Sequence, residues 1–402
     1  MIRKVDILER AEEWQLRPDV VEKDYVLGWL LAALARHPTV PSTWVFKGGT
    51  CLKKCYFETY RLSEDLDFSL RPEASYDANG LRALLVEIVR DATELSGITF
   101  PLDLVTVETK RDKLGRPTFR ARITYGGPLA HPGGPRVLFD ITQHEPLLDE
   151  PVARPIHHPY PDDLPVGTLV QCYSLDELLA EKTRALVERT RPRDLYDVVY
   201  VFENLAAALN LSRFRQVFHG KCDAKSIAVP TASSIVALVH GSAELRADWS
   251  NMLGHQLPLL PEIEGFLARL TTLLACLEEA GPIPAALTGA PLADGESLVV
   301  DSGVRFWGRG VPLELVRFAG ANRLLVEFDY HGRHRLAEPY SLRTASTGNL
   351  LLYAWERGSM TIKAFKVGEI QNLRATQTAF ALRYRIEFTE GGPLRAPTIR
   401  TE

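Results

Sequence analysis

The chain has 402 residues, 46% hydrophobic and 24% charged, a balance typical of a globular protein with about two to three domains. Its net charge of -4 excludes a globally basic nucleic-acid binder, so contact with nucleic acid requires a local basic patch. No apolar run reaches the ~18 residues of a membrane-spanning helix and the first residues lack a signal-peptide core, so we expect a cytoplasmic protein without a membrane partner.

The N-terminal segment predicts two helices over residues 3–38, because apolar residues recur at helical spacing on both sides of Pro18. Charged residues interrupt the start of the second helix. We interpret them as a solvated first turn. The alternative is that Lys23 or Asp24 faces a functional site.

A short strand over residues 44–46 leads into a Gly48-Gly49 turn and an amphipathic helix, which Thr50 is predicted to cap. This arrangement suits a phosphate, because glycines let the backbone approach the anion and the helix dipole attracts it. Lys47 stands beside the turn. A Gly-Gly pair is common, so the turn takes its meaning from the residues that follow.

Two carboxylates lie on the next predicted strand, DLDFSL. Asp65 and Asp67 are two residues apart and therefore face the same side of that strand. Neighbouring carboxylates repel one another unless a divalent cation lies between them, and Mg²⁺ prefers a few carboxylates together with phosphates and waters. Asp140, in the apolar strand VLFDI, would complete a two-metal clamp for displacement at phosphorus. The alternative for the first two acids is a solvent-facing strand edge.

The middle of the chain predicts one helix, three strands and then a long helical part. The segments are a helix over 81–95, strands within 98–112, 118–127 and 136–142, helices from Ser174 to about 205, and further helices over 211–282. Ser174, followed three residues later by Glu177, indicates a capping box. The helices after it carry Lys182 and the acids Asp194 and Asp197, which are three residues apart on one helix and can face the same site.

The five cysteines are an odd number without the spacing of a metal site, which predicts reduced thiols. Cys51 and Cys55 are four apart on a predicted helix and are interpreted as core residues. Cys172, Cys222 and Cys276 are scattered along the chain.

The last third of the chain differs in character. Residues 281–312 are rich in Gly, Pro and Ala, which indicates a linker. Beyond it, alternating residues and turn signals at Gly332, Gly348 and Gly358 predict a small β domain over 313–402. The first domain then spans residues 1–280, with a core over 15–205 and a helical part over 206–280.

Taken in order, the motifs GGT, SEDLDF, an acid in an apolar strand, EKTRAL and RPRDLYD resemble the AbiEii/AbiGii family of nucleotidyltransferase-like toxins, which includes the MenT toxins. The resemblance covers roughly residues 15–240. It implies an α+β fold with a polymerase-β-like nucleotidyltransferase core and added helices. It also implies a toxin with a cognate antitoxin. Characterised members transfer nucleotides from an NTP to a target, notably the 3′ end of tRNA, and others are known as GTP-binding phage-defence toxins.

The resemblance also implies a role for each matching residue. The nucleotide-binding set is Gly48, Gly49, Thr50, Ser63 and Lys47, and the metal-binding set is Asp65, Asp67 and Asp140. Lys182 is expected to meet a phosphate, since a lysine is a mobile point charge. Asp194 or Asp197 is expected to orient that lysine or to act near the acceptor. The alternative for Asp194 is an exposed acid at the end of the helix, paired with Arg193 or Arg191.

Basic residues elsewhere are weaker candidates for contact with RNA. Arg189 and Arg193 belong to the basic run RTRPR, which suits an RNA acceptor or a triphosphate. The alternative is a solvated charged face.

The C-terminal segment resembles a WYL domain, an SH3-like β fold whose members sense ligands. Leu352-Tyr353-Ala354 stands where that family has Trp-Tyr-Leu, which is a departure from its pattern. The resemblance implies four ligand-facing residues, Tyr330, Arg333, Arg335 and Tyr353. The alternative for the two tyrosines is packing within the sheet.

The function we expect is a Mg²⁺-dependent nucleotidyltransferase toxin, with Mn²⁺ as an alternative ion. It would transfer a nucleoside monophosphate from an NTP to the 3′ end of tRNA or another RNA and release pyrophosphate. One alternative is a nucleotidyltransferase that modifies a protein. Another is a regulator that binds GTP or RNA with the same fold and has no turnover. A third is a kinase-like phosphotransferase that uses the same pocket.

Overall fold

The computed structural model describes most of the chain. The described residues are 1–112, 115–205, 208–278, 289, 290, 292, 298–299, 311–345 and 347–388. Most of the predicted linker over 281–312 therefore lies outside the described residues, as does the side chain of Cys276.

The N-terminal part is built on a mixed seven-stranded sheet in the order β3-β4-β5-β2-β1-β7-β6. The strands are β1 (Trp44–Lys47), β2 (Asp65–Leu70), β3 (Thr106–Arg111), β4 (Pro117–Thr124), β5 (Arg136–Thr142), β6 (Val152–Pro155) and β7 (Leu169–Cys172). β2 runs parallel to β5 and antiparallel to β1, so segments far apart in sequence meet at the centre. The strands predicted from alternation are confirmed, although β3 begins only at Thr106.

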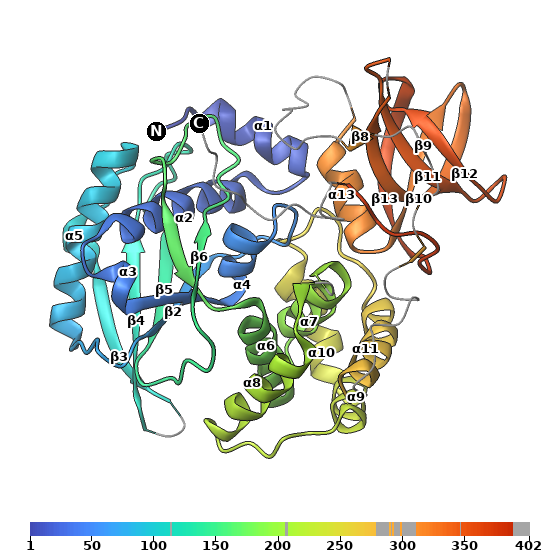
Figure 1. Ribbon diagram of the computed structural model, residues 1–402. Coiled ribbons are helices and arrows are strands. Elements are labelled where there is room, and N and C mark those ends of the chain that lie inside the picture. Colours follow the sequence, from blue (N-terminus) through green and yellow to red (C-terminus); the bar gives the residue numbers. More distant parts are fainter. Residues whose placement is uncertain are drawn as a thin grey trace.

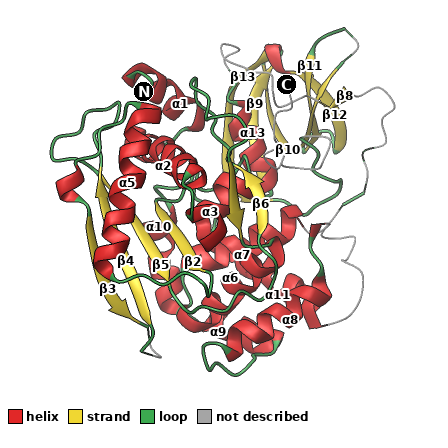
Figure 2. Ribbon diagram, turned by 60° about the vertical axis from the view of Figure 1, so that its left-hand side comes forward, coloured by secondary structure: helices red, strands yellow, loops and turns green. Residues whose placement is uncertain are grey.

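Helices cover one face of this sheet (Figure 2). They are α2 (Pro18–Arg36), the short α3 (Val40–Thr43) and α5 (Ala78–Ser96), and α1 (Lys4–Trp14) packs against α2. Phe119, Phe139 and Ile141 are buried on β4 and β5, whereas the residues between them are partly exposed. This alternation leaves the opposite face of the sheet for polar side chains. Pro18 begins α2 at its first turn instead of interrupting a helix, a position where its missing N–H costs nothing.

A helical part continues the chain on the other side of the central strands (Figure 1). Its helices are α6 (Leu175–Arg189), α7 (Pro192–Leu205), α8 (Leu211–Asp223), α9 (Ala232–Gly241), α10 (Ala243–Leu253) and α11 (Ile263–Glu278). The Ser174 hydroxyl accepts a hydrogen bond from the N–H of Glu177, which confirms the predicted cap. The box is not closed, because the Glu177 carboxylate instead accepts the N–H groups of Leu148 and Asp149.

The C-terminal part is an antiparallel sheet in the order β12-β11-β10-β9-β13, with β8 also paired to β10. Its elements are β8 (Leu298–Val299), α13 (Leu313–Ala321), β9 (Leu324–Tyr330), β10 (Arg333–Thr344), β11 (Leu350–Glu356), β12 (Thr361–Lys366) and β13 (Ile370–Ala379). Gly332, Gly348 and Gly358 lie in the connections between successive strands, as predicted. None of the described helices is both long and apolar enough to cross a membrane.

The two parts share one continuous core, joined through α13. Helix α13 packs against α1 and α7 on one side and against β9, β10 and β13 on the other. Polar links cross the same contact. Asn204 donates to the carbonyl of Ala321, and Arg323 donates to the carbonyl of Glu203. The C-terminal sheet is thus anchored beside α7, a helix that carries candidate site residues.

Candidate active site

The glycine turn lies at the end of β1, where the chain enters the four-residue helix α4 (Gly48–Cys51). Gly48 has a φ of +81°, and a Cβ there would lie 2.2 Å from Oδ2 of Asp67. A Cβ on Gly49 would lie 2.5 Å from the Arg61 guanidinium and 3.1 Å from Oγ of Ser63. Both glycines are required because a side chain and the backbone approach each other closely here.

Thr50 does not cap this helix, contrary to prediction. It is fully buried, and its hydroxyl donates to the carbonyl of Asp65 on the neighbouring strand. The residue preceding the helix is Lys47, and no side-chain capping bond is present there. Thr50 therefore ties the turn to the strand that carries the two acids.

Four charged residues form a row across the sheet, one from each of four adjacent strands. Lys47 on β1 is in register with Asp67 on β2, Asp67 with Asp140 on β5, and Asp140 with Arg120 on β4. Adjacent strands are about 4.8 Å apart, so neighbours in the row can interact directly. The structure thus brings Asp67 and Asp140 side by side, with Asp65 two residues along on the same face.

Burial, more than the neighbouring carboxylates, raises the pKa of two of these acids. Burial and the neighbouring Asp140 and Asp65 raise the pKa of Asp67 to about 6, although Lys47 and Lys182 act in the opposite direction. Burial, Glu64 and Asp140 also raise the pKa of Asp65. Both acids therefore resist ionisation in the protein alone, as expected for a donor set completed by a cation.

Asp140 is held by a neighbour that the sequence analysis did not consider. Arg120 donates from Nε to Oδ1 at 2.8 Å and from Nη2 to Oδ2 at 2.9 Å, and both side chains are about one-third exposed. The ligand atoms of the three acids do not all lie within 4.8 Å of one another. Among the described residues that distance is met only by Cys51, Cys55 and Cys172, whose sulfur atoms cluster in the core. The place of Cys172 in the sequence had indicated an isolated thiol. The structure instead brings it beside Cys51 and Cys55.

Lys182 and the two acids of α7 do come together. Nζ of Lys182 lies 2.8 Å from Oδ2 of Asp197 and 3.7 Å from Oδ1 of Asp194. Both acids are fully buried, so the alternative of an exposed Asp194 is wrong. Asp194 instead accepts two hydrogen bonds from Arg189. Each acid can therefore hold the lysine in a fixed place beside the sheet.

Arg61 binds Asp197, one of the two acids that hold Lys182. Its guanidinium is buried and donates to both oxygens of Asp197, at 2.6 and 2.8 Å. Burial alone would favour the neutral acid, but the charges of Arg61 and Lys182 hold the pKa of Asp197 below its usual value. Because Arg61 also borders Gly49, it connects the glycine turn with the helix that positions Lys182.

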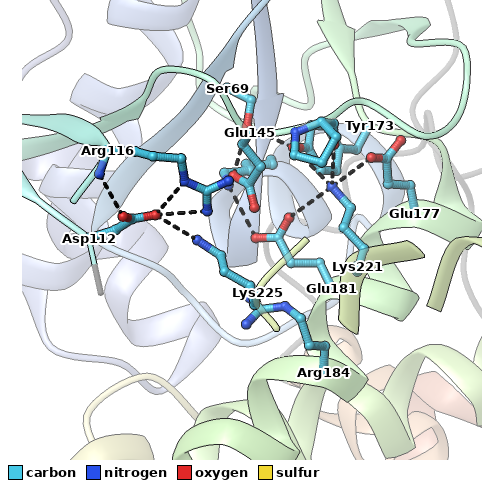
Figure 3. Close-up of polar contacts among 12 residues, drawn as sticks. Ser69, Asp112, Arg116, Glu145, Tyr173, Glu177, Glu181, Arg184, Lys221 and Lys225 are labelled. Atoms are coloured by element: carbon cyan, nitrogen blue, oxygen red, sulfur yellow. Dashed lines mark hydrogen bonds and ion pairs between the residues drawn. The ribbon is translucent and has the colours of Figure 1, made fainter. Parts of the chain in front are cut away.

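Lys47 points into a buried charge network. Its ammonium group is paired with Glu145 and lies 3.3 Å from Glu181. Burial disfavours this charge, but the two glutamates outweigh it and raise the pKa of Lys47. Figure 3 shows Glu145 and Glu181 near Lys221, which pairs with Glu177 at 2.7 Å over the ring of Tyr173.

Two further sequence interpretations change with the structure. Asp24 is not solvated, because it is buried and paired with the equally buried Lys54 at 2.6 Å. Lys23 instead pairs with Glu64 at 2.7 Å, one residue before Asp65, so its alternative role beside the site is favoured.

The remaining candidates lie in α6, α7 and the C-terminal sheet. Arg189 is engaged by Asp194, and Arg193 is partly buried and donates to the carbonyl of Met252. In the C-terminal sheet, Arg335 pairs with Glu356, the Tyr330 hydroxyl donates to Glu369 and Arg333 is exposed. Tyr353 lies under the Arg343 guanidinium. The Tyr330 ring packs against Phe365 on β12, and Phe365 pairs with Leu352, the residue before Tyr353 on β11.

Three residues of the site were missed from sequence, namely Arg61, Arg120 and Glu181. Arg120 had a signal, because it alternates with buried residues on a strand and faces the same way as Asp140. The other two had none, since their partners come from distant parts of the chain.

Comparison with known proteins places the chain in context. One similar solved structure is MenT4, nucleotidyltransferase toxin Rv2826c from Mycobacterium tuberculosis H37Rv, with a TM-score of 0.44 and 20% identity. The alignment covers 70% of this chain and 91% of that one. No curated protein matched the chain. The family model described as "Nucleotidyl transferase AbiEii toxin, Type IV TA system" matches residues 29–275. The chain therefore belongs to the AbiEii family, the nucleotidyltransferase toxins of type IV toxin–antitoxin systems.

Proposed function

We propose that this nucleotidyltransferase transfers a nucleoside monophosphate from an NTP to the 3′ end of tRNA and releases pyrophosphate. The observation that carries the proposal is the row in which Asp67 and Asp140 adjoin, next to a glycine turn that closes over Asp67. A triphosphate at the turn and an acceptor hydroxyl beside Asp140 would then lie on either side of the carboxylates.

The donor set fits Mg²⁺. Three carboxylates on adjoining strands are hard oxygen ligands. Burial, with a smaller contribution from neighbouring carboxylates, raises the pKa of Asp65 and Asp67, and a divalent ion would offset both effects. Asp65, Asp67 and Asp140 would hold the ion, and Mn²⁺ would suit the same ligands. When bound, it supplies charge neutralisation at the triphosphate and at the attacking oxygen.

The protein's own groups position the reactants. Gly48 and Gly49 admit phosphate oxygens to the backbone N–H groups of the turn, with the Ser63 hydroxyl beside them. Lys182 presents a point charge that Asp194 and Asp197 fix in place, suited to a phosphate oxygen. The charge of the buried Lys47 favours the ionised form of Asp67. Thr50 holds the turn against β2.

The test is label transfer from NTPs carrying a labelled α-phosphate to total tRNA, with Mg²⁺ or with EDTA. We expect transfer with Mg²⁺ and loss of at least a hundredfold for Asp65→Asn or Asp67→Asn, roughly 3 kcal/mol of transition-state stabilisation. Asp91→Asn, an exposed acid on α5, is the matched control and should retain activity. Equal transfer by the site variants and the control would contradict the assignment.

The same assay separates the rival functions. Label that survives RNase and stays with protein indicates a protein acceptor. Label that transfers only from the γ-phosphate indicates a kinase-like reaction. Tight NTP or RNA binding without any product indicates a regulator without turnover.

We also propose roles for the C-terminal sheet and for a cognate antitoxin in the cytoplasm. The sheet, with its WYL-like and SH3-like resemblance, would recognise RNA or regulate the enzyme through α13, whose Glu314 accepts a hydrogen bond from Thr59 two residues before Arg61. A folded protein lacking residues 313–402 with unchanged activity and RNA affinity would refute this role. Expression should slow growth, and a neighbouring gene product should relieve it. The same experiment in phage-infected cells tests a defence role.

A further inference from the structure

The face of β3, β4 and β5 that carries Asp140 is rich in positive charge. Alternation along the strands places Lys110, Arg120, Arg122 and Arg136 on this face, and we call these four residues the basic face. Only Glu108 and Asp140 oppose them on the same strands and face. Arg120 pairs with Asp140 and Arg122 pairs with Glu108, so the four cations exceed the two carboxylates by two charges, in a chain whose net charge is -4.

These side chains are accessible. Lys110 and Arg136 are exposed, and the side chains of Arg120 and Arg122 are 35% and 33% exposed. The buried apolar residues of β4 and β5 point to the opposite face. The basic face is therefore available to a partner without unfolding any element.

The basic face lies on a defined side of the carboxylates, away from the glycine turn. The turn ends β1, and moving away from it across the sheet one meets Asp67, Asp140 and then Arg120. Three strand spacings, about 14 Å, separate the backbone of Lys47 from that of Arg120. If the triphosphate lies at the turn, the second reactant approaches the carboxylates from the Arg120 side.

Arg120 is suited to contact a phosphate. Its guanidinium already grips both oxygens of Asp140, and the same planar fork matches two oxygens of a phosphodiester. Moving from the carboxylate to a phosphate would free Asp140 to act with Asp65 and Asp67. An acceptor phosphate would then both dock the acceptor and complete the acid set.

We propose that the basic face receives the phosphate backbone of the acceptor RNA, with Arg120 holding the phosphate nearest the reactive 3′ end. This rests on the proposed nucleotide transfer and narrows it, because it requires a polyanionic acceptor. A protein acceptor does not need such a surface, so it becomes an outcome of the test.

The experiment measures binding of fluorescein-labelled tRNA to the full-length protein at two salt concentrations, together with steady-state transfer kinetics. The variants are Arg120→Gln and Arg136→Gln, with Arg90→Gln on the exposed side of α5 as the control of equal charge. Both basic-face variants should weaken tRNA binding on the order of threefold and reduce the salt slope by about one, whereas the control should not. Arg120→Gln should raise KM for tRNA and leave KM for the NTP unchanged. Arg120→Lys, which keeps the charge without the fork, should recover part of the binding.

The proposal is overturned if both basic-face variants bind tRNA as Arg90→Gln does. It is equally overturned if wild-type protein does not bind tRNA, or if label goes to a protein at a rate that Arg120→Gln leaves unchanged. Salt-dependent tRNA binding by wild-type protein and by Asp67→Asn, without any transfer by wild type, would instead refute the proposed reaction and leave the basic face standing.

Discussion

The Asp67 side chain is affected by residues from several elements. It lies under Gly48, beside Asp140, and in the fields of Lys47 and Lys182. Burial raises its pKa to about 6, so at neutral pH the protein keeps an ionised group in a place that disfavours it. The ionised form of Asp67 therefore lowers the stability of the fold at neutral pH.

The raised pKa predicts a stability gain on neutralising Asp67. The contribution of a carboxyl with a raised folded pKa is present below its ordinary value of 3.8 and is lost as the pH rises through about 6. In EDTA at pH 7.5, Asp67→Asn should therefore be more stable than wild type by about 1 kcal/mol, and the difference should vanish near pH 4. Thermal melts across this pH range check it, and a lower melting temperature for Asp67→Asn at pH 7.5 would contradict it.

Arg61 differs from Asp67, because its buried charge stabilises the protein. It is a buried cation whose removal leaves the equally buried Asp197 with Lys182 and the hydroxyl of Tyr60. Arg61→Met should lower the free energy of unfolding by about 3 kcal/mol, since breaking a buried pair strands the remaining charge. Urea unfolding measures this, with Arg90→Met as the exposed control. A loss no larger than that of the control would show that the pair is dispensable.

At the scale of elements, the turn between β1 and α4 is defined by two separate demands. Gly48 needs a positive φ, which a side chain disfavours, and it also needs the space that Asp67 occupies. Gly133, in the loop between β4 and β5, has a φ of +83° with no atom within 4 Å of a Cβ. A comparison of Gly48 with Gly133 therefore separates the effect of backbone strain from the effect of the close approach to Asp67.

We predict different outcomes for Gly48→Ala and Gly133→Ala. Each should cost about 1–2 kcal/mol of stability for the left-handed backbone. Only Gly48→Ala should also abolish nucleotide transfer, because its Cβ displaces the Asp67 carboxylate. Transfer assays beside melting curves test this. Equal activity of both variants would mean that the contact with Asp67 is not needed.

At the scale of the whole molecule, the two sheets are joined through α13, which is buried on both sides. Leu313, Leu315, Val316 and Phe318 of this helix belong to the same continuous core as α7 and the strands of the C-terminal sheet. Such a shared core makes the two parts unfold together.

Calorimetry should accordingly show a single unfolding transition. Leu315→Ala truncates a buried side chain of α13. It should lower the free energy of unfolding by about 2–5 kcal/mol and shift the whole transition to a lower temperature. Leu336→Ala on β10, where the leucine is exposed, should leave it almost unchanged. Two transitions, with only one shifted by Leu315→Ala, would show that the parts fold independently.

The sequence was informative wherever the cause is local. The period of apolar residues identified α2, α5, β2 and β5, and a two-residue spacing placed Asp65 and Asp67 on one face. The Gly48-Gly49 turn was visible because glycine marks a backbone that other residues cannot follow. The prediction for Thr50 failed because a hydroxyl beside a helix can cap it or bond across to a strand, and only the neighbouring β2 decides between these.

Sequence alone thus determined the acids, the turn and the family to which their order points. Only the tertiary structure decided which residue stands next to which. Strand order joined Lys47, Asp67, Asp140 and Arg120 into one row, although they come from four strands scattered over more than ninety positions. Folding likewise joined Arg61 with Asp197 and Lys47 with Glu145. Charge pairs of this kind have no local signal, because either partner alone resembles an ordinary surface residue until burial makes it depend on the other.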